Sequence, residues 1–408
     1  MKRYALVGTG SRALGMFALP LSRDYADVAT LVGVHDRNRL RAELVSRKAG
    51  GVPVYDDFDA MLRAGRPDTV IVCTMDGVHH DYTIRALEAG CDVISEKPMT
   101  IDGPRCRAIL EAERRTGRKV TVIFNLRSYA LAERVKQLVL RGDVGTILAA
   151  DFEWILDTRH GADYFRRWHR NLDSSGGLLV HKATHHFDIV NWWLGEDPVT
   201  VYANGSRRYY GDDRRPHGER CLTCAYARDC ELYFDLRADP EMVELYLETE
   251  SADGYFRDRC VFDSSIDIMD SMSVAVRYSG GALLTYSLVA HSPWEGWRIS
   301  LTGTGGRLEA EDFSSGPRAA ERGQEIRVYD RRGELTTHRV ERSEGVHGGS
   351  DERLRRRLFR GDLPDPLGQV APSRAGAMSL LIGAAANQSI ATGRPVAIAD
   401  LLGGAIPA

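Results

Sequence analysis

The sequence predicts an α/β protein in two parts, an N-terminal doubly wound parallel sheet and a C-terminal α+β region with a large, mainly antiparallel open sheet. Three observations lead to this fold class. Short apolar runs alternate with helical segments in the first third of the chain, a glycine-rich turn follows the first apolar run, and a period-two alternation appears later. With 408 residues the chain is long enough for two domains with separate cores.

The N-terminal third consists of repeated strand–helix units. The unbroken apolar run over residues 68–73 is typical of a strand that is buried on both faces. Glycines at positions 50–51 and 90 follow two of the helices and supply C-caps. Units of this length favour a parallel sheet. The expected strands cover residues 3–8, 29–34, 68–73, 92–95 and 119–124, and the expected helices cover residues 14 onward, 37–49, 79–89 and 102–116.

From about residue 130 hairpins replace these units. A helix over residues 131–140 comes first, and Ser279-Gly280-Gly281 then joins two alternating strands at 271–278 and 282–290. This pattern favours an antiparallel sheet with helices on one face. The later expected elements are hairpins of 297–302 with 307–310 and of 326–330 with 334–339, and an apolar helix over 374–389.

These changes of pattern predict the domain boundaries. We expect a nucleotide-binding domain over residues 1–124 and a substrate and oligomerisation domain over residues 125–408. The second domain contains a cysteine-rich insertion around residues 205–262, which begins with the polar, loop-like stretch 207–220.

Composition argues against several classes of protein. A formal net charge of −3 with 27% charged residues gives no reason to expect a nucleic-acid partner. No apolar run approaches the roughly 20 residues of a membrane span. The apolar start is cut by the glycine turn, so it predicts a first strand rather than a signal peptide. Seven scattered cysteines suit a reducing compartment. We therefore expect a cytoplasmic protein with no membrane or nucleic-acid partner.

The glycine-rich turn predicts a dinucleotide site of the Rossmann type. Gly8 permits the tight turn, and Gly10 lets the backbone approach a pyrophosphate at the start of the following helix. Ala13 stands at the third glycine position, a permitted variant. Asp36 ends the second strand, where it can accept a hydrogen bond from a ribose 2′-hydroxyl and repel a 2′-phosphate. Arg37 weakens this discrimination, so NAD is favoured and NADP stays open. A turn without a ligand is the alternative, which the strand–turn–helix context disfavours.

A Glu-Lys-Pro segment follows the strand at 92–95 and places Lys97 at the carboxyl edge of the predicted sheet, where a nicotinamide would lie. Together with the glycine turn and Asp36, this segment resembles the Gfo/Idh/MocA family of nicotinamide-dependent sugar and cyclitol oxidoreductases. The stretch 74–79 resembles the family's Thr-Pro-Asn-x-x-His loop under the nicotinamide, with Met75 and Asp76 as departures. Residues 125–127 resemble its Asn-x-Arg segment. The resemblance and the turn together imply cofactor contacts from Gly8, Gly10, Ser11, Arg12, Ala13, Asp36, Arg37, Thr74, Asp76, His79, Glu96, Lys97 and Asn125.

A helix beginning near Gly176-Gly177 carries a second group of titratable side chains. His181, His185 and Asp188 have spacings of four and three, so they are expected on one helical face. Such groups can also be solvated or satisfy a local core, but three in register beside a Gly-Gly start favour a site. The helix resembles the family's Gly-Gly…Asp-x-Gly-x-His-x-x-Asp motif, with His181 in place of Asp and Ala183 in place of Gly.

These residues suggest catalytic roles. His185 is the expected base for the hydroxyl proton, because imidazole is matched to neutral pH. Lys97 is expected to hold the alcohol oxygen, with its pKa lowered by burial. His181 is expected to share the proton traffic. Lys182 either binds a substrate group or reaches solvent. A zinc pair of His181 and His185 has little support, because Lys182 stands where the metalloprotease pattern has its glutamate.

Aromatic and basic residues crowd the segment 159–170. Aromatic rings stack on sugar faces and arginine binds hydroxyls and anions, which suits a substrate pocket. An amphipathic surface segment is the equally weighted alternative. The expected substrate contacts are Arg127, Tyr164, Arg167, Trp168, Lys182 and His186.

The cysteine cluster contains a Cys-x-x-Cys pair, Cys221 and Cys224, followed by Cys230. This spacing predicts a structural zinc with Cys260 as fourth ligand and His217 as its competitor. An iron–sulfur cluster, a disulfide or free thiols are the alternatives. The other cysteines are expected in the core, at Cys73, Cys91 and Cys106.

The sequence thus predicts an NAD-dependent oxidoreductase that transfers a hydride between nicotinamide and a hydroxyl or keto carbon of a sugar, sugar derivative or cyclitol. An NAD-dependent glycosidase, in which a hydride is taken, a substituent is eliminated and the hydride is returned, would use the same residues. A nucleotide sensor without chemistry is a third possibility, against which Lys97 and His185 argue. The resemblance also implies a homodimer or homotetramer that pairs through the open sheet face.

Overall fold

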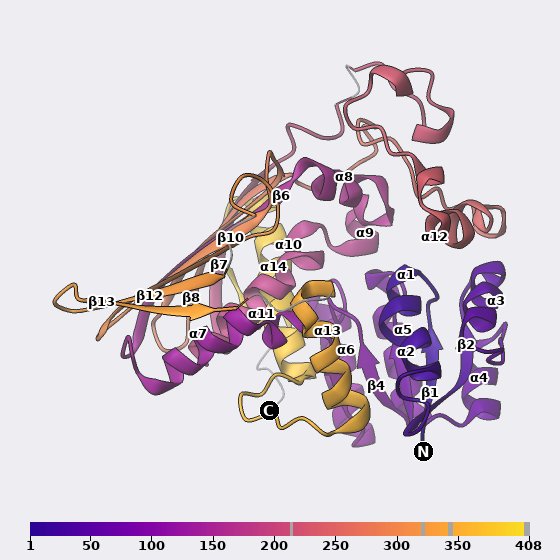
Figure 1. Cartoon of the computed structure of the whole chain (residues 1–408), viewed down its shortest axis with the longest axis horizontal. Coiled ribbons are helices and arrows are strands. Elements are labelled where there is room, and N and C mark those ends of the chain that lie inside the picture. Colours follow the sequence, from indigo (N-terminus) through magenta and orange to yellow (C-terminus); the bar gives the residue numbers. More distant parts are fainter. Residues whose placement is uncertain (213–214, 320–322, 342–345, 404–408) are drawn as a thin grey trace.

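Two β-sheets organise the chain in the computed structural model, which describes residues 1–212, 215–319, 323–341 and 346–403. A six-stranded sheet has the order β14-β5-β4-β3-β1-β2, and a nine-stranded sheet has the order β13-β12-β11-β10-β6-β9-β8-β7-β15. Figure 1 shows them side by side, with the N-terminal sheet at the right and the large sheet at the left. The predicted fold class is confirmed.

The six-stranded sheet is parallel except for one edge strand. Its strands are β1 (Lys2–Val7), β2 (Ala29–His35), β3 (Thr69–Val72), β4 (Asp92–Ser95), β5 (Val120–Val122) and the antiparallel β14 (Ala371–Pro372). The strand order changes direction between β1 and β3, and open sheets of this kind bind ligands outside the carboxyl ends of the strands at such a point. Thr9, Asp36, Thr74 and Lys97 therefore come together, because each follows one of four neighbouring strands.

Helices cover both faces of this sheet, and three of them begin at side-chain caps. Asn38, Asp57 and Asp102 each accept a hydrogen bond from a backbone N–H three residues later. The first helical segment begins at Ser11 rather than near residue 14, so the glycine turn leads directly into it. The helix at 58–65 was not predicted, although its buried Phe58, Met61 and Leu62 have helical spacing. The helical segments are α1 (Ser11–Ala13), η1 (Leu14–Ala18), α2 (Leu19–Ser22), α3 (Arg39–Lys48), α4 (Phe58–Gly65), α5 (His79–Glu88) and α6 (Gly103–Thr116).

The nine-stranded sheet is antiparallel apart from the β6–β9 pair. Burial alternates along its strands, so one face is packed and the other is open. Its first two strands were not predicted. The strands are β6 (Ile147–Asp157), β7 (Pro198–Ser206), β8 (Ser271–Tyr278), β9 (Leu283–Ser292), β10 (Gly296–Gly303), β11 (Gly306–Phe313), β12 (Gln324–Asp330), β13 (Leu335–Val340) and β15 (Val396–Ala397).

Three helices fill the space between the packed face and the N-terminal domain (Figure 1). They are α7 (Ala130–Arg141), α11 (Ala183–Leu194) and α14 (Ser373–Thr392). A side chain at Gly383 of α14 would meet the backbone of Leu179, so this glycine allows the helices to approach closely. Among the described residues, none of the helices combines the length and the apolar composition that a membrane span needs.

The helix expected to run on from Gly176-Gly177 is in fact two helices. The short α10 (Leu178–His181) stops at Lys182, and α11 begins at Ala183. This break corrects the assumption of one continuous helical face. His181 and His185 line the cavity between the domains, whereas Asp188 does not.

The cysteine-rich insertion connects β7 to β8 and reaches the N-terminal domain. Residues 213–214 of its loop lie outside the described residues. Its later part forms α12 (Pro240–Met242) and the turns η8 (Val243–Leu247) and η9 (Glu250–Ala252), which lie above α1 and α3 in Figure 1. Leu245 and Tyr246 are buried in the hydrophobic cluster of the N-terminal domain. The insertion is therefore packed onto the first domain.

Candidate active site

A cavity of about 670 Å³ lies between the two domains, at the carboxyl ends of β1 to β4. Both domains and the insertion contribute to its wall. A space of this size is sufficient for a small ligand beside an extended cofactor. All of the predicted cofactor residues line it: Gly8, Gly10, Ser11, Arg12, Ala13, Asp36, Arg37, Thr74, Asp76, His79, Glu96, Lys97 and Asn125.

The glycine turn is fixed by the close approach of β1 and β3. Gly8 has φ = +83°, and a Cβ there would lie 2.5 Å from the carbonyl of Cys73. Only glycine satisfies both demands. Gly10 caps the following helix without a side chain, so the backbone N–H groups behind it face the cavity.

Asp36 holds this turn in place. One carboxylate oxygen accepts hydrogen bonds from the backbone N–H of Thr9 at 2.7 Å and from its hydroxyl at 2.9 Å. The other accepts from the N–H of Asn38 at 2.8 Å. Asp36 therefore lies at the end of β2 as predicted, and its orientation is set by the protein itself.

Lys97 lies at the centre of a buried polar chain. Its Nζ donates to the backbone oxygen of His181 at 2.9 Å and lies 3.4 Å from Nε2 of the same residue. On the far side of the imidazole, Nδ1 is 2.5 Å from Oδ2 of Asp76. Because lysine can only donate, the geometry assigns the imidazole proton to Nδ1 and leaves Nε2 as the acceptor. Asp76, His181 and Lys97 thus form a continuous chain.

Burial governs the protonation of this chain. Burial lowers the pKa of Lys97 to about 8, against the opposing effect of the Asp76 and Glu96 carboxylates. Burial also lowers the pKa of His181 well below its usual value, and the positive charge of Lys97 acts in the same direction. The pKa of Asp76 is raised by burial. His181 is therefore a neutral imidazole at physiological pH.

His185 lines the same cavity from the first turn of α11. Its Nδ1 is buried and has no hydrogen-bond partner among the described residues. The ring rests against Phe124 with 5.7 Å between ring centres. Burial and the charge of Lys97 lower the pKa of His185 well below its ordinary value. The side chain is a neutral imidazole with unused hydrogen-bonding capacity, as a proton acceptor requires.

Asp188 and Arg127 do not line the cavity, although the sequence suggested that both belong to the site. Asp188 lies outside the cavity and forms a buried pair with Arg127, whose Nε and Nη2 each donate to the carboxylate at 2.7 Å. A third bond runs from Arg127 Nη1 to the oxygen of Gly368 at 2.8 Å. Asp188 therefore does not share a cavity-lining face with the histidines, and Arg127, predicted as a substrate contact, does not line this cavity and is paired with Asp188 instead. A buried carboxylate requires a paired cation, which explains both positions.

Aromatic side chains with charged groups form a further wall of the cavity, which begins beside His181, where the ring centre of Tyr164 lies 5.5 Å from that of His181. The Tyr164 hydroxyl is 3.2 Å from Nε2 of His160, whose Nδ1 is 2.8 Å from a carboxylate oxygen of Glu295. Lys182 Nζ lies 5.1 Å from the ring centre of Trp154. Burial lowers the pKa of Lys182, which Glu295 opposes. His160, Glu295 and Trp154 were not predicted individually, although the alternation of β6 was a usable signal for Trp154.

The remaining expected substrate residues line the cavity, and each also contacts another side chain of the protein. Arg167 donates to Asp163 at 3.1 Å, and Trp168 stacks on His169 with 3.7 Å between ring centres. His186 stacks on Trp154 at 3.8 Å. The segment 159–170 is therefore a pocket wall, formed largely by α8 (Thr158–Arg166), rather than an outer surface.

Several cofactor candidates also hold the site together. His79 bridges two loops, with Nδ1 2.8 Å from the oxygen of Pro98 and Nε2 3.1 Å from that of Thr74. Arg12 donates to Glu96 at 2.7 Å and to Asp351 at 2.8 Å. Asp351 comes from α13 (Ser350–Arg355) late in the chain, which the sequence did not connect to this site.

The cysteine cluster does not form the predicted zinc site. Cys221, Cys224, Cys230 and Cys260 are free thiols, and no group of three His, Cys, Asp or Glu side chains among the described residues is arranged to hold a metal ion. The Cys221 sulfur accepts a hydrogen bond from Arg166 at 3.1 Å, and the Cys260 sulfur accepts one from the N–H of Phe262 at 3.4 Å. The structural zinc is therefore not supported by the described residues.

Comparisons with known proteins cover nearly the whole chain. A family model described as "Oxidoreductase family, NAD-binding Rossmann fold" matches residues 2–124. A second, described as "Oxidoreductase family, C-terminal alpha/beta domain", matches residues 136–398. YteT of Bacillus subtilis (strain 168), which carries a provisional oxidoreductase name, is 37% identical over 426 residues, or 98% of this chain and 99% of YteT.

Two relatives of defined name match over shorter stretches. The D-glucoside 3-dehydrogenase of Escherichia coli (strain K12) is 30% identical over 165 residues, which is 40% of this chain and 46% of that enzyme. The inositol 2-dehydrogenase of Rhizobium meliloti (strain 1021) is 30% identical over 204 residues, which is 50% of this chain and 58% of that enzyme.

Solved structures support the fold. The WlbA dehydrogenase from Bordetella pertussis, in complex with NADH and UDP-GlcNAcA, has a TM-score of 0.65 at 19% identity, covering 97% of this chain and 98% of its own. The aldose-aldose oxidoreductase from Caulobacter crescentus, complexed with glycerol, has a TM-score of 0.63 at 19% identity, covering 97% of this chain and 99% of its own. At such identities the likeness speaks for the fold alone.

Proposed function

The chain belongs to the Gfo/Idh/MocA oxidoreductase family, and from this premise we propose that it transfers a hydride between NAD and a hydroxyl or keto carbon of a sugar, sugar derivative or cyclitol. The observation that carries the proposal is the position of Lys97, which lines the same cavity as the glycine turn and donates to the backbone oxygen of His181. A second neutral histidine, His185, lines this cavity too. The names of the glucoside and inositol dehydrogenase relatives support this substrate class.

The residues of the first domain fit the cofactor. The N–H groups behind Gly10 suit a pyrophosphate, and Asp36 stands where a ribose hydroxyl would be recognised. When bound, the nicotinamide ring supplies the hydride acceptor or donor. The protein's part is to orient the reacting carbon and to handle the proton.

Lys97 and His185 divide the proton chemistry in this proposal. The Lys97 ammonium donates a hydrogen bond to the reacting oxygen and stabilises the negative charge that develops there. His185 accepts the hydroxyl proton, because its imidazole is neutral and lines the cavity. His181 holds Lys97 through its backbone oxygen and Nε2, and Asp76 fixes the imidazole. His181 and Asp76 are thus positioning residues.

Substrate recognition falls to the aromatic wall. Trp154 and Trp168 offer flat apolar faces on which a sugar ring stacks. Lys182 and the His160–Glu295 pair offer donors and acceptors for hydroxyl groups. A pocket with one flat apolar side and several polar groups is typical of a polyhydroxylated substrate.

The glycosidase alternative finds no support in these comparisons, since the relatives of defined name are dehydrogenases. One experiment separates the two. The purified protein is incubated with NAD and a panel of sugars, cyclitols and aryl glycosides, and both NADH absorbance and aglycone release are followed. We expect NADH formation with at least one polyol and none with the Lys97→Ala variant. Aglycone release without net NADH would overturn the proposal in favour of a glycosidase.

We also propose that the protein pairs with copies of itself through the open face of the nine-stranded sheet. Helices cover the other face of this sheet (Figure 1). On the open face the outward side chains carry alternating charges, and Arg298 lies 3.8 Å from Glu153 and 3.6 Å from Glu311. Such alternating charges suit a self-complementary surface. Light scattering should give the mass of a dimer or tetramer, and a monomer at micromolar concentration would contradict this interface.

A further inference from the structure

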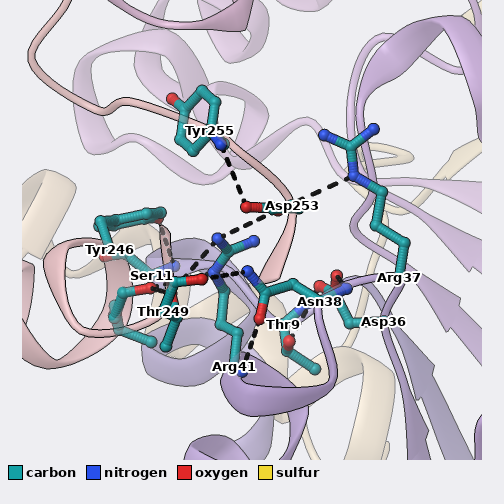
Figure 2. A network of polar contacts seen from close by, with 11 residues as sticks. Thr9, Ser11, Asp36, Arg37, Asn38, Arg41, Tyr246, Thr249, Asp253 and Tyr255 are labelled. Atoms are coloured by element: carbon teal, nitrogen blue, oxygen red, sulfur yellow. Dashed lines mark hydrogen bonds and ion pairs between the residues drawn. The ribbon is translucent and has the colours of Figure 1, made fainter. Parts of the chain in front are cut away.

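The cysteine-rich insertion forms one wall of the dinucleotide site (Figure 2). The Tyr246 hydroxyl accepts a hydrogen bond from the N–H of Ser11 at 3.0 Å, directly behind the glycine turn. Asn38 donates to the backbone oxygen of Thr249 at 2.8 Å, on the other side of the same site. Residues 239–255 therefore lie against the part of the cavity where the adenosine half of a dinucleotide would bind.

One carboxylate of this segment, Asp253, lies beside the charged side chains at the end of β2, where the adenosine ribose would bind. Asp253 lines the cavity, and its side chain is only 6% exposed. Its Oδ2 lies 3.4 Å from Nη2 of Arg41 and 3.9 Å from Nε of Arg37, and its Oδ1 accepts from the N–H of Tyr255 at 3.2 Å. Figure 2 shows the carboxylate between the two guanidinium groups. Its direction is thus fixed on both sides.

The two arginines would otherwise favour the wrong cofactor for an NAD enzyme. A guanidinium beside the acidic residue of β2 is the group that accommodates the 2′-phosphate of NADP. Arg41 is 8% exposed, and its Nε is already bound to the backbone oxygen of Leu245 at 3.0 Å. Arg37 is 58% exposed, and among the described residues Asp253 is the only carboxylate within 4.0 Å of it. Arg37 is therefore the cation that would become available to a 2′-phosphate if Asp253 lost its charge.

We propose that Asp253 is a cofactor-selectivity residue that makes this site take a 2′-hydroxyl and reject a 2′-phosphate. The proposal rests on the proposed function, and it adds a residue from the second domain to the reading of the cofactor. Asp253 neutralises Arg37 and Arg41 and places a second negative charge beside Asp36. With Asp253 present the four charges cancel, and without it the site carries one net positive charge. A phosphate with about two negative charges responds strongly to such a difference.

The test is direct binding, because no substrate is needed. The Kd values of NADH and NADPH are measured by fluorescence for the wild-type protein and for Asp253→Asn, which keeps the side-chain shape and the bond from Tyr255. We expect NADPH to bind about tenfold more tightly to the variant while NADH changes by less than about threefold, so that the preference shifts by about 1.4 kcal/mol. The gain in NADPH affinity should fall with rising salt.

Two further variants identify the cause. Adding Arg37→Ala to Asp253→Asn should abolish the gain, because Arg37 is the cation that is set free. Asp253→Glu keeps the charge and should keep the preference for NADH. Glu244→Gln is the matched control, since this carboxylate belongs to the same segment but pairs with Lys48 at 2.5 Å and does not line the cavity. It should leave both Kd values unchanged.

Three outcomes would overturn the inference. An unchanged NADPH-to-NADH ratio in a folded Asp253→Asn protein means that the carboxylate does not read the 2′ position. An equal loss of affinity for both dinucleotides means that Asp253 only anchors the segment. A wild-type protein that already prefers NADPH refutes the NAD assignment itself, which separates failure of the proposed function from failure of this inference.

Discussion

Nδ1 of His181 lies 2.5 Å from Oδ2 of Asp76, and this contact joins two positions at which the chain departs from the motifs of its family. The motif residue at position 181 is often aspartate, and the motif residue at position 76 is asparagine. Here the carboxylate stands at position 76 instead, and an imidazole lies between it and Lys97. We therefore expect the two departures to compensate one another. A carboxylate that orients an imidazole fixes both its tautomer and its direction.

Exchange of both residues tests this compensation. Asp76→Asn restores the family residue but leaves the imidazole without its carboxylate, and we expect turnover to fall by about 10- to 100-fold because Lys97 loses its support. The double variant Asp76→Asn with His181→Asp should recover part of that loss, since a carboxylate again faces the lysine. Steady-state kcat with fixed NAD is the measurement. A double variant no better than Asp76→Asn alone would show that the pair is not a replacement for the family arrangement.

The two residues assigned to the proton chemistry should behave as one unit. Lys97→Ala or His185→Ala should each lower turnover by about 10² to 10⁴, and the double variant should be little worse than either. The Kd of NADH should change far less than kcat, because neither side chain is assigned to the ribose or pyrophosphate. Lys119→Ala, an exposed lysine just before β5, serves as control and should retain full activity. Near-normal turnover in Lys97→Ala would refute the mechanism.

The pH profile should report Lys97 directly. Burial lowers its pKa to about 8, so the ammonium form predominates below that pH and the neutral amine above it. If the ammonium stabilises the reacting oxygen, kcat/KM should fall as pH rises through about 8. The Asp76 carboxylate opposes the lowering, so Asp76→Asn should move this upper limb to lower pH. An upper limb that stays in place in the variant would assign it to another group.

The parts of the site that directly follow a strand in the sequence could be predicted from the sequence alone. The glycine turn, Asp36 and Lys97 follow recognisable strands, and the parallel order of those strands brings them to one edge. Periodicity could not reveal the break at Lys182, because a helix that stops and restarts keeps nearly the same spacing. The resemblance of residues 125–127 to the family's Asn-x-Arg segment suggested a pocket role for Arg127, whose partner Asp188 lies 61 residues away.

Long-range contacts set the remaining limits. The bond between Ser11 and Tyr246 spans 235 residues, and nothing in the composition of the insertion indicates which surface it covers. The cysteine spacing suggested a ligand set, but spacing does not establish that four sulfurs converge on a point. Contacts of this kind depend on how whole elements pack, which hydrophobic patterning alone does not specify.

The buried pair of Arg127 and Asp188 should matter for stability rather than for turnover chemistry. Arg127→Met should lower the free energy of unfolding by about 3–5 kcal/mol, because it leaves Asp188 buried without a cation. Adding Asp188→Leu should restore much of the loss, since no charge then remains in the core. Urea unfolding at neutral pH measures both. The exposed pair of Arg374 and Asp197 is the control, and Arg374→Ala should change stability by less than about 1 kcal/mol.

Two glycines at the start of the chain offer the cleanest test of the dinucleotide site. A Cβ at Gly8 would lie 2.5 Å from the Cys73 carbonyl, at a φ of +83° that an L-residue rarely adopts, so Gly8→Ala must shift the turn away from β3. We expect NADH binding to be lost and the melting temperature to fall. Gly15 lies in the helical segment η1 that follows the turn, and a Cβ added there would meet no atom within 4 Å, so Gly15→Ala should keep NADH affinity and leave stability unchanged or raise it by up to about 1 kcal/mol. Isothermal titration with NADH and thermal unfolding give both readouts on the same samples. Normal NADH binding by Gly8→Ala would mean that the cofactor does not depend on this turn, and the assignment of the cavity would have to be abandoned.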